Sequence, residues 1–331
     1  MIQPGARGLS EKIMDADLDE LVDRLIEQQM VGWPELSEGI SAWREVEVRK
    51  VRIEGMDVFL QHNPKRIVST SAQVDEVSIQ NRACFLCPSN MPPGEKGLAF
   101  GKRFVIVCNP FPVLAKHLVV VSREHVPQRL SGNLTELLSL AQSLGPGFVV
   151  IYNGPASGAS APDHLHFQAG VADELPILTL LKQIGTREPE TEVLGTRAYG
   201  VRFLSVRGLS CERLALRVEE VMRVLGEMHG RSDVEPMVNL LARFTGRGWQ
   251  VIVIPRERHR PAAYFAEGDD RLIVSPAAID LGGLMVVPRE RDFTRLDASL
   301  VKAIYAEVTF SDERLDAVLG SLARGKGGRL S

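Results

Sequence analysis

The chain has 331 residues, of which 44% are hydrophobic and 24% charged, an ordinary composition for a folded globular protein. Its net charge of −3 gives no sign of a polyanion-binding surface, so we expect no nucleic-acid partner. No run approaches the roughly 18–20 apolar residues of a membrane span, and the N-terminal segment lacks an apolar signal region. We therefore expect a cytoplasmic protein without membrane contact, built as two domains or one duplicated unit.

The first half contains alternating helix and strand signals in chain order. Residues 11–31 have apolar side chains at helical spacing among charged ones, and residues 45–60 alternate as in a hairpin that turns at Gly55. Further on we predict strands at 104–108, 118–122 and 148–154, a helix at 133–144, and a last strand at 164–168. This order favours an α+β fold whose sheet is mostly antiparallel and flanked by helices.

The sequence HLHFQ at residues 164–168 is the most informative stretch of the chain. On a strand, His164, His166 and Gln168 would lie on one face, with Leu165 and Phe167 in the core. The run is therefore a metal site, a reactive site or both, the alternative being a polar edge strand with chance histidines.

The second half weakly repeats the sequence pattern of the first half. The sequence GWQVIVIPRERHRP (residues 248–261) parallels KHLVVVSREHVPQ (116–128), and LGGLMVVPRERDF (281–293) repeats the pattern, with a helix predicted from Cys211 to His229. We interpret this as a duplication in which only the first copy kept its chemistry, with a pseudo-two-fold axis relating the halves. The polar segment 185–197 marks the boundary between a catalytic half, 1–190, and a degenerate half, 191–331.

The pair Cys84 and Cys87 forms a CxxC motif suited to one tetrahedral zinc ion. Alone it could also be a redox pair or a packing feature. The available partners are five histidines, and we choose His125 and His164 to complete a closed Cys2His2 structural site. His117 is interpreted instead as a hydrogen-bonded histidine at the start of a strand.

His166 is the candidate nucleophile, because a neutral imidazole is a competent nucleophile at phosphorus. The Gln168 amide can donate to a phosphate oxygen without adding charge. Upstream, the loop NGPASGAS (153–160) allows backbone N–H groups to approach anionic oxygens, although an ordinary hairpin turn would have the same composition.

These motifs resemble the histidine-triad superfamily, in particular its nucleotidyltransferase branch of galactose-1-phosphate uridylyltransferases, diadenosine tetraphosphate phosphorylases and GDP-hexose phosphorylases. The loop GPASGAS, the run HLHFQA, the CxxC, the histidine of SREH and the segment NLLARFTGRGWQVIVIPRER carry the likeness, which spans residues 60–290.

The resemblance implies a duplicated histidine-triad fold and a covalent mechanism. His166 would attack the α-phosphorus of a nucleotide donor, a nucleotide-sugar or a dinucleoside polyphosphate, and a phosphate or sugar-phosphate acceptor would then take the nucleotide. Gln168 would hold the transferred phosphate. The substrate-binding residues implied by the resemblance are Asn153, Gly158, Ser160 and, in the HNPKR segment, Arg66. For Arg66 the alternative is a solvated surface arginine.

Two other functions stay open at this point. A nucleotide hydrolase of the same superfamily is one, although the glutamine in place of a third histidine favours transfer. A nucleotide-binding protein without turnover is the other. The duplicated chain could supply within one molecule the dimer that small triad proteins make from two, and a homodimer is also possible.

Overall fold

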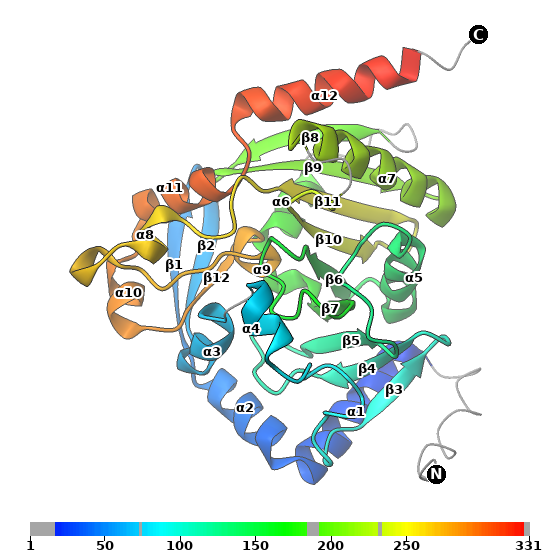
Figure 1. The fold of residues 1–331 in the computed structure, drawn as a ribbon, viewed down its shortest axis with the longest axis vertical. Coiled ribbons are helices and arrows are strands. Elements are labelled where there is room, and N and C mark those ends of the chain that lie inside the picture. Colours follow the sequence, from blue (N-terminus) through cyan, green and yellow to red (C-terminus); the bar gives the residue numbers. More distant parts are fainter. Residues whose placement is uncertain (1–16, 73–74, 184–191, 231–233, 328–331) are drawn as a thin grey trace.

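A computed structural model describes residues 17–72, 75–183, 192–230 and 234–327 of the chain. It confirms the α+β class, with two sheets flanked by helices (Figure 1). Among the described residues, no helix is both long enough and apolar enough to cross a membrane.

The larger sheet has nine strands in the order β3-β4-β5-β7-β6-β10-β11-β9-β8, and every neighbouring pair is antiparallel. Its strands are β3 Gly97–Phe100, β4 Phe104–Cys108, β5 Leu118–Ser122, β6 Phe148–Asn153, β7 His166–Val171, β8 Val193–Ala198, β9 Val201–Gly208, β10 Val238–Phe244 and β11 Trp249–Pro255. The smaller sheet has three strands in the order β1-β2-β12, which are β1 Glu47–Ile53, β2 Met56–His62 and β12 Leu284–Val287.

The helices cover both sheets and the ends of the strands. Their bounds are α1 Leu18–Gly32, α2 Pro34–Arg44, α3 Ile67–Thr70, α4 Glu76–Gln80, α5 Leu134–Leu144, α6 Pro176–Gln183, α7 Cys211–Met228, α8 Ala262–Phe265, α9 Ala278–Leu281, α10 Glu290–Arg295, α11 Ala298–Val308 and α12 Asp312–Gly327.

The central strands β6, β10 and β11 are buried along their length because both faces of the sheet are covered. Successive side chains of a strand point to opposite faces. Val150 and Tyr152 of β6 therefore join one core with α5 and α7, whereas Val149 and Ile151 join a second core with the small sheet, α9 and α11. Both cores contain residues from the two predicted halves of the chain.

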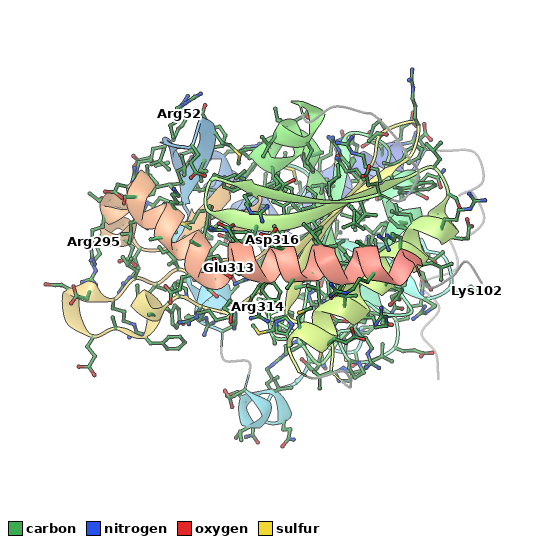
Figure 2. The ribbon with its side chains drawn as sticks, turned by 90° about the horizontal axis from the view of Figure 1, so that it is seen from above. Arg52, Lys102, Arg295, Glu313, Arg314 and Asp316 are labelled. Atoms are coloured by element: carbon green, nitrogen blue, oxygen red, sulfur yellow. The ribbon has the colours of Figure 1, made fainter. Side chains whose placement is uncertain are left out.

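Helix α12 covers the edge strand β8, and Figure 2 shows Asp316 on the side of the helix that faces the strands. Arg197 of β8 forms ion pairs with Asp312 and Asp316 of this helix. A side chain at Gly195 would collide with Leu319 of α12. The helix thus protects an edge that would otherwise offer unpaired backbone groups.

The predicted hairpin is β1 and β2, with Glu54 and Gly55 at its turn in the positive-φ region (50° and 85°). Strand β12 then pairs in parallel with β2, with Leu284 opposite Phe59. This pairing brings residues near 280 beside the segment that follows β2, and so places parts of both predicted halves around one site.

The strand order reads alike from the centre of the large sheet outward. From β6 it runs β7, β5, β4, and from β10 it runs β11, β9, β8. In sequence order the first set is β4, β5, β6, β7 and the second is β8, β9, β10, β11. Helix α5 connects β5 to β6, and helix α7 connects β9 to β10 in the same way. A two-fold axis between β6 and β10 would produce this arrangement. Whether the chain divides into two domains at residue 190 stays a prediction.

The sequence echo matched the wrong strands. Residues 249–255 were aligned with 118–122, but β11 occupies the place of β7, not of β5, and residues 284–287 lie in the other sheet. Buried strands share apolar composition whatever their place in the sheet, so a short apolar run cannot identify its counterpart.

Other predicted elements agree with the structure. The predicted helices at 133–144 and Cys211–His229 and the predicted strands at 104–108, 118–122 and 148–154 are confirmed within one residue. Part of the predicted first helix, residues 11–16, lies outside the described residues, as do 185–191 of the predicted linker. The end of that linker, from Val193, belongs to β8.

Candidate active site and metal centre

A tight turn presents the two thiols of the CxxC motif. The N–H of Cys87 donates to the carbonyl of Cys84 (3.2 Å), and the Asn90 side chain donates to the same carbonyl (2.8 Å). The turn therefore fixes the separation of the two sulfurs before any metal binds.

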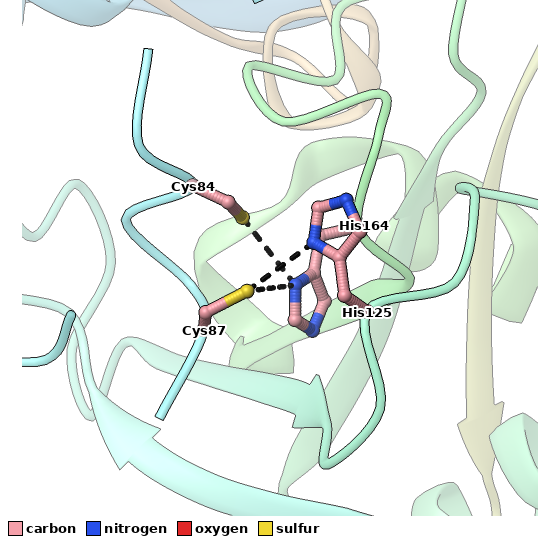
Figure 3. A group of neighbouring side chains, drawn as sticks. All are labelled: Cys84, Cys87, His125 and His164. Carbon is pink, nitrogen blue, oxygen red and sulfur yellow. Dashed lines mark hydrogen bonds between the residues drawn. The ribbon is translucent and has the colours of Figure 1, made fainter. Parts of the chain in front are cut away.

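The four predicted ligands, Cys84, Cys87, His125 and His164, come together in one cluster (Figure 3). Their ligand atoms all lie within 4.8 Å of one another, and three sulfur-to-Nδ1 distances are 3.2, 3.4 and 3.6 Å. In a tetrahedral zinc site, bond lengths of about 2.3 Å to sulfur and 2.0–2.1 Å to nitrogen imply S–N separations of about 3.5 Å. The four side chains could thus hold one metal ion.

The surrounding hydrogen bonds present the correct ring atoms to this centre. The Nε2–H of His164 donates to the carbonyl of Ser122 (2.8 Å), which leaves Nδ1 with its lone pair toward the sulfurs. Asp163 lies 3.8 Å from Nε2 of His125 and is paired with Arg82. Burial raises the pKa of the Cys84 thiol to about 11, so a bound cation is what would ionise it at neutral pH.

His164 does not lie on the strand, contrary to the prediction that it shares a face with His166 and Gln168. Strand β7 begins at His166, and His164 belongs to the turn before it, where its N–H donates to the carbonyl of Ala161 (3.2 Å). Pro162 lies within this turn and has no N–H for a ladder bond. The turn directs the His164 ring to the metal centre, while His166 and Gln168 share a strand face as predicted.

His166 is held in one tautomer at the start of β7. Its Nδ1–H donates to the carbonyl of His164 (2.8 Å), so that Nε2 carries the free lone pair. The side chain is 5% exposed, and this burial lowers its pKa to about 4. At neutral pH the imidazole is therefore uncharged, as a nucleophile must be.

Gln128 anchors the backbone around His166. Its Oε1 accepts from the N–H of His166 (2.8 Å), and its Nε2 donates to the carbonyls of His166 (3.0 Å) and Asn153 (2.9 Å). Sequence reasoning missed this residue, because nothing in the segment around it distinguishes it from a surface glutamine.

His117 fixes the orientation of Gln168. The N–H of Val113 donates to Nδ1 of His117 (3.2 Å), so the proton of the neutral ring is on Nε2, which donates to Oε1 of Gln168 (2.9 Å). Burial and the nearby Arg66 lower the pKa of His117 to about 3. The prediction of a hydrogen-bonded histidine was right, but its connection to Gln168 was not foreseen.

One pocket gathers the predicted substrate-binding residues. Arg66, Asn153, Gly158, Ser160 and Gln168 all line it. His166, two residues before Gln168 on β7, is buried and does not line the pocket itself. Residues of the second half complete the wall, and these are His259, Arg260, Ser275, Ala277, Ile279, Asp280 and Val286.

The loop after β6 forms part of the pocket floor. Gly158 has φ of +101°, and a Cβ there would lie 2.8 Å from the Cβ of Ala277, so no larger residue fits. The Oδ1 of Asn153 accepts from Asn239 (2.7 Å) and from the N–H of Ala278 (3.0 Å). With its oxygen engaged by the protein, the Asn153 side chain offers its NH2 to a ligand.

Arg66 lines the pocket rather than lying free on the surface. Its Nη1 donates to the carbonyl of Phe111 (3.1 Å). Burial lowers the pKa of this guanidinium, and Asp280 opposes the shift. The remaining guanidinium donors suit an anionic group in the pocket.

Comparisons with known proteins agree with this architecture. Residues 25–171 match a family described as a domain of unknown function, DUF4922, and residues 179–323 match the GDPGP1-like, C-terminal domain family. No curated protein matches the chain.

Among solved structures, the chain is similar to yeast Ap4A phosphorylase Apa2, with a TM-score of 0.64 and 16% identity over 87% of this chain and 97% of that one. The same yeast enzyme in complex with AMP gives a TM-score of 0.60, at 16% identity over 87% and 96% of the chains. Its complex with Ap4A gives 0.57, at 17% identity over 84% and 96%. These likenesses establish the shared fold.

Proposed function

This chain has the fold of the nucleotidyltransferase and phosphorylase branch of the histidine-triad superfamily, and from that premise we propose that it transfers a nucleotidyl group through a covalent bond to His166. The donor would be a nucleotide-sugar or a dinucleoside polyphosphate, and the acceptor phosphate or a sugar phosphate. The location we propose is the cytoplasm, and a homodimer stays open.

The observation that carries the proposal is the fixed, neutral tautomer of His166. Its Nδ1–H is committed to the carbonyl of His164, so the lone pair of Nε2 is available to attack the α-phosphorus of the donor. A P–N bond forms, the bond from phosphorus to the bridging oxygen breaks, and the leaving phosphate departs with that electron pair. The Nδ1 hydrogen bond then stabilises the positive charge that develops on the ring.

The neighbouring donors suit the transferred phosphate. His117 holds the oxygen of Gln168, which leaves the Gln168 NH2 as a neutral donor beside the nucleophile. Asn153, Ser160 and Arg66 add hydrogen bonds or charge from the pocket wall. The N–H groups of the loop around Gly158 support the same role.

The metal we propose for the Cys84, Cys87, His125 and His164 cluster is zinc, in a closed structural site. Four protein ligands leave no open position, so the ion would supply folding energy and rigidity. Because the carbonyl of His164 accepts the Nδ1–H of His166, fixing His164 also fixes the nucleophile.

Intact mass after incubation with nucleotide donors tests the proposal. The wild-type chain should gain the mass of one nucleoside monophosphate, phosphate should discharge it, and His166→Ala should gain none. His62→Asn is the matched control, because His62 stacks on Phe293 away from the cluster.

The other two functions predict different outcomes in the same experiment. A hydrolase would cleave the donor at a rate that phosphate or a sugar phosphate does not change. A binding protein would bind nucleotide without forming an adduct. Normal transfer by His166→Ala would exclude the covalent mechanism.

A further inference from the structure

A second group of polar side chains faces the proposed nucleotide site from the C-terminal half. The loop after β11 carries His259 and Arg260, and the segment before α9 carries Ser275, all three in the pocket wall. The proposed nucleotidyl chemistry gives these residues no role.

The guanidinium of Arg260 is fixed in place by the protein. Its Nε donates to Oγ of Ser275 (3.1 Å), and its Nη2 donates to the carbonyls of Thr70 (3.1 Å) and Ala72 (2.9 Å). The group also lies over the ring of Tyr264, 4.3 Å from the centroid. Among the described residues these contacts use Nε and Nη2 and none uses Nη1, whose N–H groups can meet a ligand.

Within the described parts of the chain, no carboxylate forms an ion pair with Arg260 or with Arg256, which is fully buried. Arg256 donates to the carbonyls of Val308 (2.9 Å), Arg258 (3.0 Å) and His259 (2.9 Å) and to Asn239. Burial lowers the pKa of Arg256 to about 9, so it stays cationic at neutral pH.

Asp280, the carboxylate of the pocket, does not pair with the arginines of this wall. Asp280 accepts from the N–H groups of Ala277 (2.9 Å) and Val286 (2.8 Å) and acts on Arg66 and Arg256 only at a distance. A partly buried cation without a counter-ion is costly unless something anionic completes it. A mobile anion in the pocket meets that need.

Ser275 and His259 extend the same set of donors. Because Oγ of Ser275 accepts from Arg260, its own O–H is free to donate to Nε2 of His259 (3.3 Å). Burial and Arg260 lower the pKa of His259 to about 4, so the ring is neutral at neutral pH. A neutral imidazole keeps one N–H donor and one acceptor nitrogen in the pocket wall.

We propose that Arg260, positioned by Ser275 and flanked by His259 and Arg66, forms the subsite for the phosphate that accepts the nucleotidyl group. This rests on the proposed function of the same pocket. An oxygen of the bound phosphate attacks the phosphorus of the nucleotidyl-His166, a P–O bond forms, and the P–N bond breaks with its electron pair returning to Nε2. In the reverse direction the same subsite holds the leaving phosphate of the donor.

Phosphate binding tests the subsite without turnover. Inorganic phosphate should raise the melting temperature of the wild-type chain relative to chloride at equal ionic strength. Arg260→Gln should weaken the apparent affinity for phosphate by at least about tenfold, since one charge-assisted contact accounts for about 1.5–3 kcal/mol. Arg258→Gln is the matched control, because Arg258 lies two residues earlier and pairs with Glu307.

Discharge of the covalent adduct tests the role in transfer. The adduct would be prepared from a nucleoside 5′-phosphorimidazolide, whose leaving group is imidazole and does not use the subsite. Arg260→Gln should therefore form the adduct at a rate near that of wild type but lose it to phosphate at least about tenfold more slowly. Equal discharge in Arg260→Gln and Arg258→Gln would overturn the proposal.

The remaining outcomes are also decisive. Faster discharge by a hexose 1-phosphate than by inorganic phosphate identifies a phosphate monoester as the acceptor, and the opposite order identifies free phosphate. If Arg260→Gln does not fold, the same measurements are made on Ser275→Ala. Discharge of the adduct that depends on phosphate as in wild type would then refute the subsite. Arg260-dependent phosphate binding without any wild-type adduct would leave the subsite standing and reject the covalent function.

Discussion

A single hydrogen bond decides which end of the Gln168 amide faces the pocket. His117 donates to Oε1, so the amide presents hydrogens and not oxygen to the ligand. A phosphate oxygen in the pocket would then contact the NH2 donor of Gln168. With the amide flipped, it would face the amide oxygen, which is also an acceptor. The buried neutral histidine is therefore a positioning residue for Gln168, the proposed donor to the transferred phosphate.

Gln168→Ala should slow formation of the adduct from a nucleoside phosphorimidazolide by about 10²–10³, the usual cost of one preorganised donor in a transition state. Gln168→Glu should be slower still, because a carboxylate would repel the phosphate. Rapid-quench measurement of adduct formation checks both. An unchanged rate in Gln168→Ala would show that this amide does not contact the transferred phosphate.

His259 should make the stability of the protein depend on pH. Its pKa is lowered to about 4 in the folded chain, against an ordinary value of about 6.5. Between these values the unfolded state binds the extra proton, so the stabilisation present above about pH 6.5 is lost as the pH falls toward 4.

The measurement compares wild type with His259→Asn in urea unfolding at several pH values. The variant should show a shallower loss of unfolding free energy, by up to about 1.4 kcal/mol per pH unit in this window. Contributions from the metal ligands are common to both proteins and cancel. Identical slopes would mean that His259 titrates normally in the folded state.

At the scale of elements, the CxxC turn and the turn before β7 are separate segments that one metal centre would join. Both turns are short and irregular. Within the ligand cluster, the two turns contact each other through Cys84 and Cys87 on one side and His164 on the other. A bound zinc ion would therefore contribute directly to folding this corner of the molecule.

Cys84→Ser should lower the zinc content toward zero and the melting temperature with it. Cys211→Ser is the matched control, since Cys211 lies at the start of α7 and outside the cluster. Metal analysis of the purified variants, together with thermal unfolding, checks this. Full zinc content in Cys84→Ser, or a metal-free wild-type protein, would contradict the assignment.

At the scale of the whole molecule, the two predicted halves share their structure. Strand β10 pairs with β6 at the centre of the large sheet, and β12 pairs with β2 in the small one. Both hydrophobic cores contain residues from each half. Neither half has a complete core by itself.

Residues 1–190 expressed alone should therefore fail to fold cooperatively, because the buried strand β6 would expose one whole edge. Coexpression with residues 191–331 should restore a folded complex. Size-exclusion chromatography and near-ultraviolet circular dichroism distinguish the outcomes. A monomeric fragment 1–190 with cooperative unfolding would show that the predicted first half is an independent domain.

Local chemistry could be predicted from the sequence because it depends on short spacings. The CxxC turn, the hairpin at Gly55 and the shared strand face of His166 and Gln168 follow from backbone geometry within a few residues. The same local rule failed at His164, where the chain is still in a turn.

The remaining features of the site depend on contacts between distant segments. His117 reaches Gln168 across the β5–β7 pairing, and Arg260 reaches Ser275 and α3 through the loop after β11. The true counterpart of β7 in the second half, β11, also became evident from strand order.

The sequence by itself therefore determined the chemical groups, namely two thiols, the paired histidines and the glutamine, together with their class of fold. Only the tertiary structure decided the tautomer of His166, the orientation of Gln168 and the cationic wall from the second half. The orientation of Gln168 and the place of Arg260 depend on contacts with distant residues, His117 and Thr70, which strand pairing and packing bring close. The tautomer of His166 depends on the carbonyl of His164, only two residues earlier, and that bond forms because the chain is still in a turn at His164.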